Sequence, residues 1–174
     1  MGPEQRLAEI VRQHLGGVLF HVTDQANLES VDQHGLLSRD EARLRDVSAA
    51  LPGGSPLTQE LDERAMLTDY VFLGFFPSRV MPAHPEQRRR RPRTLHIDPS
   101  ILLKRGVRLA LGPANHRNTD TYSVGRAFAK IDWEVFEPEF DAKAIMNAAR
   151  VDRVWKYEIL VPKVVERAYI VGIE

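Results

Sequence analysis

A glutamate on an apolar strand is the first candidate for chemistry in this sequence. Residues 154–162 alternate with a period of two, which is typical of a β-strand, and Pro162 closes the run. Glu158 shares one face of this strand with Leu160. Burying an unpaired carboxylate is costly, so we expect Glu158 either to face a cleft or to meet a partner. The alternative is a glutamate on a solvent-facing side of the sheet, the commoner situation for this residue type.

Other polar residues lie on strands that otherwise resemble core. His21 and Thr23 share one face of a strand at residues 18–23, and Tyr70 lies near the head of a strongly hydrophobic strand at residues 69–76. Each has a structural alternative. The histidine could be buried against a backbone carbonyl, the threonine could be an ordinary β-branched strand residue, and the tyrosine could direct its hydroxyl into water.

Several other kinds of site are excluded by the sequence. The 174 residues contain no cysteine, which excludes a disulfide framework, a thiolate metal site and a thiol nucleophile. No Gly-X-Gly or Gly-Lys-Ser/Thr pattern is present, so neither a Rossmann nor a P-loop nucleotide site is expected. There is no Gly-X-Ser-X-Gly elbow, and the histidines are scattered without a His-Glu-X-X-His run, so we expect neither a serine hydrolase nor a metal site.

The elements that must position these residues alternate between helices and strands. Hydrophobic spacing, caps and breakers predict helices at residues 3–15, 24–35, 39–50, 58–66, 121–130, 131–136 and 141–150. Further strands are predicted at residues 94–98, 107–111 and 168–171. With no internal repeat and no linker, the length fits one α+β domain over residues 1–174.

Charge is balanced overall but concentrated in one segment. The 24 lysines and arginines cancel the 24 aspartates and glutamates, which argues against a general nucleic-acid coat. Residues 88–93 nevertheless hold five arginines in a proline-containing loop, which either binds phosphates or is only solvated. No apolar run approaches a membrane span and the N-terminus lacks a signal-peptide core, so we expect a cytoplasmic protein with no membrane partner.

The order of several short motifs resembles the DarT-type DNA ADP-ribosyltransferase toxins. The motifs are Phe-His-Val-Thr with a following Asn-Leu at 20–28, His-Gly-Leu-Leu-Ser at 34–38, Asp-Tyr-Val at 69–71, Asn-His at 115–116 before a helix ending Ile-Asp-Trp at 131–133, and Tyr-Glu-Ile-Leu-Val at 157–161. Each is weak alone, but their ordered combination is fairly specific. The resemblance implies an α+β ADP-ribosyltransferase fold in one domain, with central mixed or antiparallel sheets flanked by helices.

The resemblance also implies NAD+ as co-substrate and a base in single-stranded DNA as acceptor. Glu158 would be the catalytic residue that stabilises positive charge on the ribose while the nicotinamide bond breaks. Arg64, or Arg45 as the second choice, would hold the pyrophosphate with a forked pair of hydrogen bonds.

Further contacts follow from the same resemblance. His21, Thr23 and Asn27 would contact the ADP-ribose part of NAD+, and Tyr70 would stack on nicotinamide. The residues expected near DNA are Arg79, Arg88, Arg89, Arg90, Arg91, Asn115 and His116. The family follows its Asp-Tyr-Val with Pro-Phe-Tyr-Phe and an Asn-Pro-Arg-Ser-Pro-Met turn, whereas residues 72–81 here keep only the proline, arginine and methionine of that turn. The target base is therefore left open.

Two alternatives stay open beside this one: the same NAD+ chemistry on RNA or a protein, and a non-catalytic binding module for nucleic acid or protein. The joint presence of His21, Thr23 and Glu158 favours a working enzyme. Toxins of this kind are paired with an antitoxin. The resemblance therefore implies an antitoxin partner, for which a macrodomain ADP-ribosylglycohydrolase is one candidate.

Overall fold

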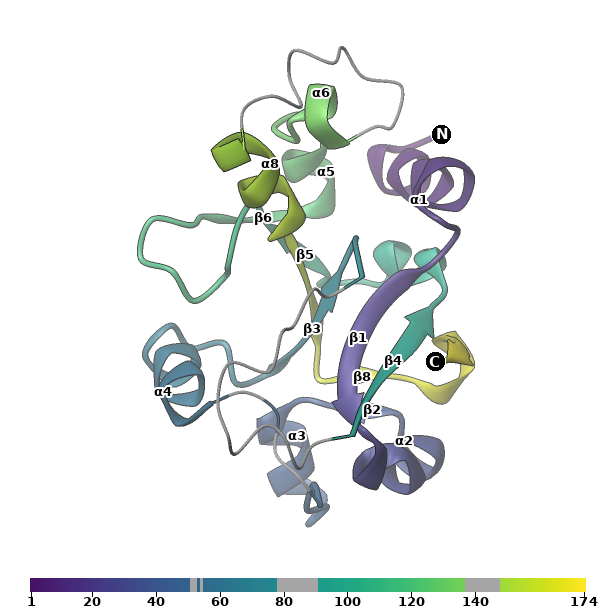
Figure 1. Cartoon of the computed structure of the whole chain (residues 1–174), viewed down its shortest axis with the longest axis vertical. Coiled ribbons are helices and arrows are strands. Elements are labelled where there is room, and N and C mark those ends of the chain that lie inside the picture. The colour runs from purple at the N-terminus through teal and green to yellow at the C-terminus, as the bar shows by residue number, and fades with distance from the viewer. Residues whose placement is uncertain (51–52, 54, 78–90, 137–147) are drawn as a thin grey trace.

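One antiparallel sheet of seven strands runs through the centre of the molecule (Figure 1). The computed structural model describes residues 1–50, 53, 55–77, 91–136 and 148–174. In spatial order the strands are β6 (Thr121–Ser123), β5 (Arg108–Ala110), β7 (Glu158–Pro162), β3 (Tyr70–Gly74), β1 (Leu19–Asp24), β4 (Pro92–Ile97) and β9 (Ile170–Ile173). A small second sheet pairs β2 (Leu36–Leu37) with β8 (Val164–Val165).

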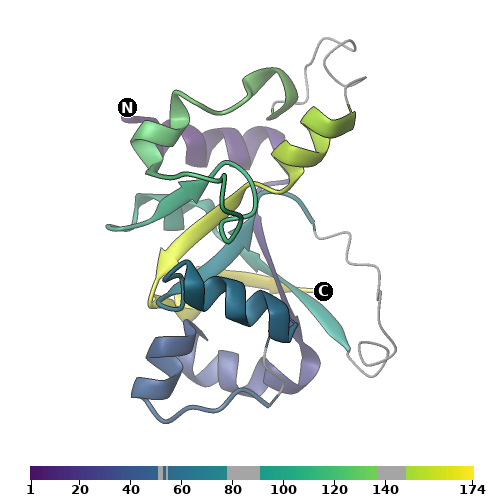
Figure 2. The same ribbon diagram turned by 90° about the vertical axis from the view of Figure 1, so that its left-hand side faces the viewer.

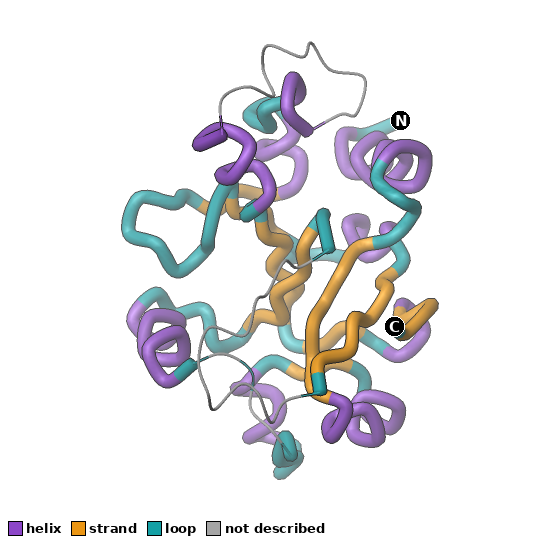
Figure 3. The backbone as a smooth tube through the Cα atoms, in the orientation of Figure 1, coloured by secondary structure: helices purple, strands orange, loops and turns teal. Residues whose placement is uncertain are grey.

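Two groups of helices lie at opposite ends of this sheet, as the two perpendicular ribbon views show (Figures 1 and 2). One group consists of α1 (Pro3–His14), α5 (Val124–Phe128), α6 (Trp133–Phe136) and α8 (Ala148–Trp155). The other consists of α2 (Leu28–His34), α3 (Arg39–Leu44) and α4 (Pro56–Arg64). Short 3₁₀ turns complete the fold at η1 (Gln25–Asn27), η3 (Pro99–Leu103) and η4 (Arg167–Tyr169). Figure 3 shows the strands in orange between the purple helices.

Hydroxyl and carboxylate caps determine where the short helices begin. Ser38, Ser55 and Ser123 accept hydrogen bonds from backbone amides in the first turns of α3, α4 and α5. Asp24 accepts from the amide of Ala26 and so converts the end of β1 into η1. Such caps satisfy amides that a helix start would otherwise leave unpaired, and each contributes about 1 kcal/mol.

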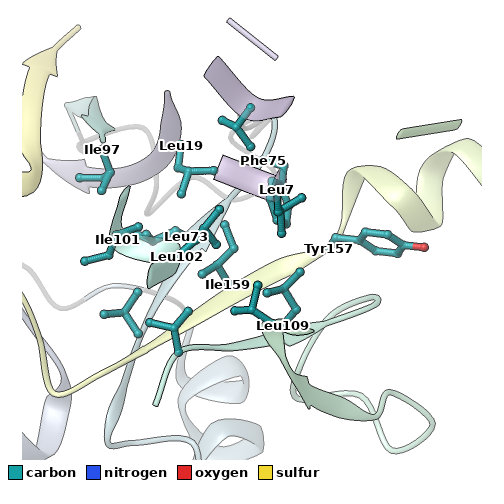
Figure 4. Close-up of a cluster of buried hydrophobic side chains, with 14 of the residues drawn as sticks. Leu7, Leu19, Leu73, Phe75, Ile97, Ile101, Leu102, Leu109, Tyr157 and Ile159 are labelled. Atoms are coloured by element: carbon teal, nitrogen blue, oxygen red, sulfur yellow. The ribbon is translucent and has the colours of Figure 1, made fainter. Parts of the chain in front are cut away.

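The hydrophobic core lies where the sheet meets α1 and η3 (Figure 4). Leu73 of β3, Leu109 of β5 and Ile159 of β7 bury their side chains almost completely there. Leu7 of α1 and Leu102 of η3 meet them from the helical side. Full burial of a side chain of this size contributes about 1.5–3 kcal/mol, so this cluster fixes the register of the central strands.

The sheet is almost divided between β1 and β3. A single register pair, Phe20 with Gly74, joins them, whereas six pairs join β1 to β4 and five join β3 to β7. Beyond that pair, Nδ1 of His21 lies 2.8 Å from the carbonyl oxygen of Phe72. A side chain thus satisfies a backbone acceptor that a continuous ladder would have paired with β1.

The predicted fold class is confirmed, but two predicted elements are wrong in their boundaries. Residues 121–130 do not form one helix, because Thr121 and Tyr122 pair with β5 and the helix begins only after Ser123. The strand predicted over residues 154–162 begins at Glu158, because residues 148–155 form the helix α8. The apolar residues of this helix at 151, 154 and 155 have helical spacing and lie on one face, where Val154 is buried.

The boundaries of two further predicted elements also differ from the structure. The helix expected over residues 39–50 ends at Leu44, and the last strand lies at Ile170–Ile173 after a 3₁₀ turn. Of the helix predicted over residues 141–150, residues 141–147 lie outside the described part. Over the residues that the structure describes, no helix combines the length and the apolar character needed to span a membrane.

Gly35 occupies a backbone conformation that other residues rarely adopt. It follows α2 with φ +75° and ψ −169°, and a Cβ there would lie 2.4 Å from the carbonyl oxygen of Val165. We expect Gly35→Ala to lower the free energy of unfolding by more than about 2 kcal/mol, as measured by urea denaturation. Gly16→Ala is the matched control, because Gly16 also has a positive φ (+78°) but open space around the added Cβ. That change should cost only about 1 kcal/mol, and equal losses for the two variants would contradict the steric argument.

Candidate active site

A cleft of about 980 Å³ opens where β1 and β3 diverge. Its walls come from residues 20–22 of β1, residues 72–74 of β3, Pro113 in the loop after β5, and α8. Glu158 at the start of β7 also lines it. Clefts of this volume, with mostly apolar walls and a few polar groups, are typical of small-molecule sites.

Small neighbours leave the carboxylate of Glu158 uncovered by the adjacent strands. Glu158 pairs with Gly74 on β3 and with Ala110 on β5, so directly opposed positions carry no side chain or only a methyl group. Gly74 pairs in turn with Phe20 at the joint between β1 and β3. Since opposed residues of paired strands point to the same face, the carboxylate extends into the cleft at this joint.

The environment of Glu158 favours its protonated form. Burial raises the pKa of Glu158 from 4.5 to about 7, and the negative charge of Asp62 adds a smaller upward effect. The backbone amide of Ala114 donates a hydrogen bond to Oε2 at 2.7 Å and only partly opposes this rise. A carboxyl group whose pKa lies near neutrality can both accept and release a proton at physiological pH. The cleft therefore holds a group suited to acid–base work.

His21 contributes a neutral imidazole to the same cleft. Burial lowers its pKa, and the hydrogen bond to the carbonyl of Phe72 opposes this only in part. A carbonyl oxygen can only accept, so Nδ1 carries the proton and Nε2 is left as an acceptor. His21 is thus suited to receive a hydrogen bond from a hydroxyl group of a ligand. Its assignment to NAD+ stays a prediction.

The other residues predicted to contact NAD+ lie farther along the strands. Oγ1 of Thr23 accepts a hydrogen bond from Nδ2 of Asn27 at 3.2 Å, at the end of β1, and neither residue lines the cleft. Tyr70 is half-buried at the start of β3, on the Glu158 face, against Leu67. It lies four positions before Gly74, which corresponds to about 13 Å along the strand.

Neither of the two candidate arginines lines the cleft. Arg45 donates to Glu41 at 2.7 Å, and Arg64 is paired with Glu60, each with a glutamate four residues earlier. Pairs four residues apart on a helix contribute about 0.3–0.5 kcal/mol, so a phosphate could displace either glutamate. The choice of pyrophosphate ligand therefore stays a prediction.

Asn115, predicted to lie near the acceptor, is joined to a residue that the sequence did not indicate. Nδ2 of Asn115 donates to Oδ1 of Asp62 at 2.9 Å, and Oδ2 of Asp62 accepts from Arg39 at 2.8 Å. His116 follows in an exposed turn, where its Nδ1 accepts from the amide of Asn118 at 3.4 Å. Asn115 thus adjoins Ala114, the residue that binds Glu158.

Most of the predicted DNA contacts fall outside the described residues, namely Arg79, Arg88, Arg89 and Arg90. Arg91 is exposed, and its backbone amide donates to Oδ2 of Asp24 at 2.8 Å. Arg93 donates to Oε1 of Gln25 at 3.1 Å. The C-terminal end of the arginine run is therefore attached to the end of β1.

The sequence also did not single out an aromatic wall. Phe76, just after β3, and Trp155, at the end of α8, stack with ring centroids 4.7 Å apart and an interplanar angle of 16°. Both line the cleft, as does Phe20 on β1. Flat aromatic surfaces of this kind suit planar rings such as a nucleobase or a nicotinamide. A Phe-Phe pair at a strand end and a tryptophan on a helix resemble ordinary core residues, so the sequence pattern did not predict an aromatic surface in the cleft.

The raised pKa of Glu158 predicts a pH-dependent effect of Glu158→Gln on stability. Because the folded-state pKa of about 7 lies above the ordinary 4.5, protonation stabilises the fold. That contribution is complete below pH 4.5 and is lost as the pH rises through 7. The neutral glutamine avoids the loss, so near pH 8 we expect the variant to exceed the wild type in free energy of unfolding by up to roughly 3 kcal/mol. The excess should shrink toward pH 4.5.

Urea denaturation across this pH range measures the effect. Glu29→Gln, which removes an exposed carboxylate on α2, controls for the change in net charge. A constant difference between Glu158→Gln and the wild type at all pH values would show that Glu158 is an ordinary solvated carboxylate.

Comparisons with known proteins agree with this geometry. The family model described as "DarT: ssDNA thymidine ADP-ribosyltransferase" matches residues 20–174. The structure of Thermus sp. 2.9 DarT in complex with ADP-ribosylated ssDNA has a TM-score of 0.69 and 19% identity, covering 90% of this chain and 80% of that chain. In complex with NAD+, the Thermus sp. 2.9 DarT structure has a TM-score of 0.63 and 18% identity, with the same coverage.

Thermosipho africanus DarTG in complex with ADP-ribose has a TM-score of 0.64 and 16% identity. The match covers 90% of this chain but 43% of that chain, so this chain spans less than half of the DarTG chain. A comparison with curated proteins finds no match.

The solved structures confirm the predicted ADP-ribosyltransferase fold. The family model covers nearly the whole chain and confirms the family that the ordered motifs predicted. This chain belongs to the DarT family of ssDNA thymidine ADP-ribosyltransferases.

Proposed function

We propose that this chain transfers ADP-ribose from NAD+ to a thymidine base in single-stranded DNA, with Glu158 as its catalytic residue. The observation that carries the proposal is the carboxylate of Glu158 in the cleft between β1 and β3, with a pKa close to neutrality. The family match covers this residue and the whole cleft. The Thermus relative in complex with NAD+ and with ADP-ribosylated ssDNA supports both substrates.

Cleavage of the bond between nicotinamide and ribose builds positive charge on the ribose. The bonding electrons leave with nicotinamide, which becomes neutral, and the anomeric carbon takes on oxocarbenium character. An ionised Glu158 close to that carbon stabilises the charge electrostatically, in a cleft whose partial exclusion of water strengthens the effect. Removal of one such group commonly costs about a hundredfold or more in rate.

Attack by the base requires that a proton be removed. In thymidine the ring nitrogen that still carries hydrogen loses that proton as its bond to the ribose carbon forms. Glu158 accepts the proton and releases it to solvent, which its pKa of about 7 permits at physiological pH. Oε1 is the oxygen available for this step, since Oε2 accepts from the amide of Ala114.

The remaining residues of the cleft bind and orient. Nε2 of His21 accepts a hydrogen bond from a ribose hydroxyl, while Nδ1–H keeps the ring fixed against Phe72. Phe76 and Trp155 offer a planar apolar surface beside Glu158. Either Arg64 or Arg45 would hold the pyrophosphate. Both lie on the α3–α4 side, and among the described contacts each is paired with one glutamate of its own helix.

The cellular setting is part of the same proposal. We place the protein in the cytoplasm, where it would meet single-stranded DNA, and propose that it is a toxin controlled by an antitoxin. A macrodomain ADP-ribosylglycohydrolase is the candidate antitoxin, because it would remove the same group that this site attaches. The likeness to DarTG and the toxin-family motifs support this partner.

Glu158→Ala and Glu158→Gln should each lower the rate of ADP-ribose transfer by about a hundredfold or more. Affinity for NAD+ should change little, because the pyrophosphate and adenosine parts make their contacts elsewhere. The measurement is mass spectrometry of thymidine-containing and thymidine-free DNA oligonucleotides, with matched RNA, after incubation with NAD+. Glu29→Gln is the control. Transfer at the wild-type rate by Glu158→Ala would refute the mechanism, and preferential modification of RNA would change the substrate class.

Arg64→Ala should weaken NAD+ binding at least about tenfold more than Arg45→Ala, since a lost phosphate contact by arginine costs roughly 1.5–3 kcal/mol. Isothermal titration calorimetry of both variants decides between them. The reverse order would move the pyrophosphate site to Arg45. Unchanged affinity in both variants would remove both residues from the site.

A further inference from the structure

We propose that Asp62 is a positioning residue for catalysis: through Asn115 it holds the loop after β5 so that the amide of Ala114 stays bonded to Glu158. Asp62 lies on α4 and would not itself touch either substrate. The inference rests on the proposed function in that it takes Glu158 as the catalytic carboxylate.

Asp62 is buried and both of its oxygens are used. Its side chain is 11% exposed, whereas the side chains of its helix neighbours Glu60 and Glu63 are more than half exposed. Oδ2 accepts from Arg39 at 2.8 Å and Oδ1 accepts from Asn115 at 2.9 Å. A buried carboxylate with one cationic and one neutral donor has a defined orientation, because losing either bond would leave charge unsatisfied.

The loop that Asp62 holds has little regular structure of its own. Residues 111–120 join β5 to β6 through turns, such as the bond from the amide of His116 to the carbonyl of Pro113. Among the described contacts, two side chains that are distant in the sequence hold it by hydrogen bonds. These are Glu158, bound by the amide of Ala114, and Asp62, bound by the side chain of Asn115. Ala114 also belongs to a small buried hydrophobic cluster that includes Leu160.

The two bonds are mechanically linked because Ala114 and Asn115 are consecutive. Consecutive Cα atoms are about 3.8 Å apart, so displacement of Asn115 moves the amide that faces Glu158. A hydrogen bond of 2.7 Å is already short, and its strength falls steeply with misalignment. A shift of the Glu158 carboxylate by about 1 Å would be enough to lower the rate of transfer a hundredfold.

Asp62 acts on Glu158 in two opposite ways, which makes its role separable by mutation. Its negative charge raises the pKa of Glu158, while the amide that it helps to position lowers it. Other charged or titratable groups that line the same cleft are His21 on β1, Asp152 on α8, and Lys156 and Tyr157 directly after that helix. Asp152 and Lys156 are paired with each other at 2.7 Å. None of these is altered by a change at Asp62 or Asn115.

Asn115→Ala keeps the charge of Asp62 but breaks the link to the loop. We expect it to lower kcat for transfer to a thymidine-containing DNA oligonucleotide by about tenfold or more, with KM for NAD+ within about twofold. The pH dependence of kcat should shift to higher pH, because Glu158 loses the hydrogen bond from the Ala114 amide, which lowers its pKa. Asp62→Asn keeps an oxygen acceptor for Asn115 but removes the negative charge that raises the pKa of Glu158. The pH dependence of kcat in this variant should therefore shift to lower pH, with a smaller loss of kcat than in Asn115→Ala. Glu63→Gln changes the exposed neighbour of Asp62 on α4 and is the matched control. It should leave kcat and the pH dependence of kcat unchanged.

A direct titration of Glu158 separates this inference from the proposed function. The carboxyl carbon of Glu158, followed by ¹³C NMR in the full chain, reports its protonation without any substrate. Opposite shifts of that titration in Asn115→Ala and Asp62→Asn support the inference even if the wild type modifies no DNA. Identical titrations in the wild type and both variants, or unchanged kcat in Asn115→Ala, overturn it. Should Asn115→Ala fail to fold, Asp62→Ala replaces it, because alanine removes the charge and also the oxygen that accepts from Asn115. A larger loss of kcat in Asp62→Ala than in Asp62→Asn supports the inference, and equal kcat in the two variants overturns it.

Discussion

The site depends on the way in which β1 and β3 separate. A β-sheet stays continuous because each backbone amide and carbonyl has a partner on the next strand. Here Phe20 and Gly74 form the one pair in register, and the carbonyl of Phe72 is bonded by the imidazole of His21 instead of an amide of β1. The strands can therefore diverge without leaving that acceptor unsatisfied. The resulting cleft is open to a ligand at the centre of the sheet.

Glu158 is placed at this joint at a cost to stability. Its neighbours across the strands are Gly74 and Ala110, which provide no polar group to pair with the carboxylate, and burial raises its pKa to about 7. A glutamate kept there destabilises the ionised protein but supplies a proton acceptor at neutral pH. The same carboxyl group on the solvated face of an edge strand would be more stable and chemically less useful.

The two groups of helices supply different parts of the cleft. On the side of α8, Arg150 bonds to Asp132 and Glu134 at 2.5–2.6 Å and so fixes that helix, with Trp155 at its end, against the turn before α6. On the opposite side, α3 and α4 carry the network that ends at Asn115. The central sheet provides Glu158 and His21. Changes on the α8 side can therefore alter the aromatic surface at Trp155, and changes on the α3–α4 side can separately alter the environment of the Glu158 carboxylate.

The order of short motifs in the sequence indicated the family by resemblance. Apolar periodicity and turn residues, which are local signals, indicated the fold class and the strands that carry His21 and Glu158, although the Glu158 strand was predicted to begin four residues too early. Other features depended on the tertiary structure. Arg45 and Arg64 each follow a glutamate by four residues, so local pattern gives no basis for choosing between them. Asp62 lies in a charged helix beside exposed glutamates, and its carboxylate is covered by Arg39 and by a loop more than fifty residues later in the chain. Long-range contacts of this kind have no counterpart in hydrophobic spacing, which is why the support of Glu158 became visible only in the folded chain.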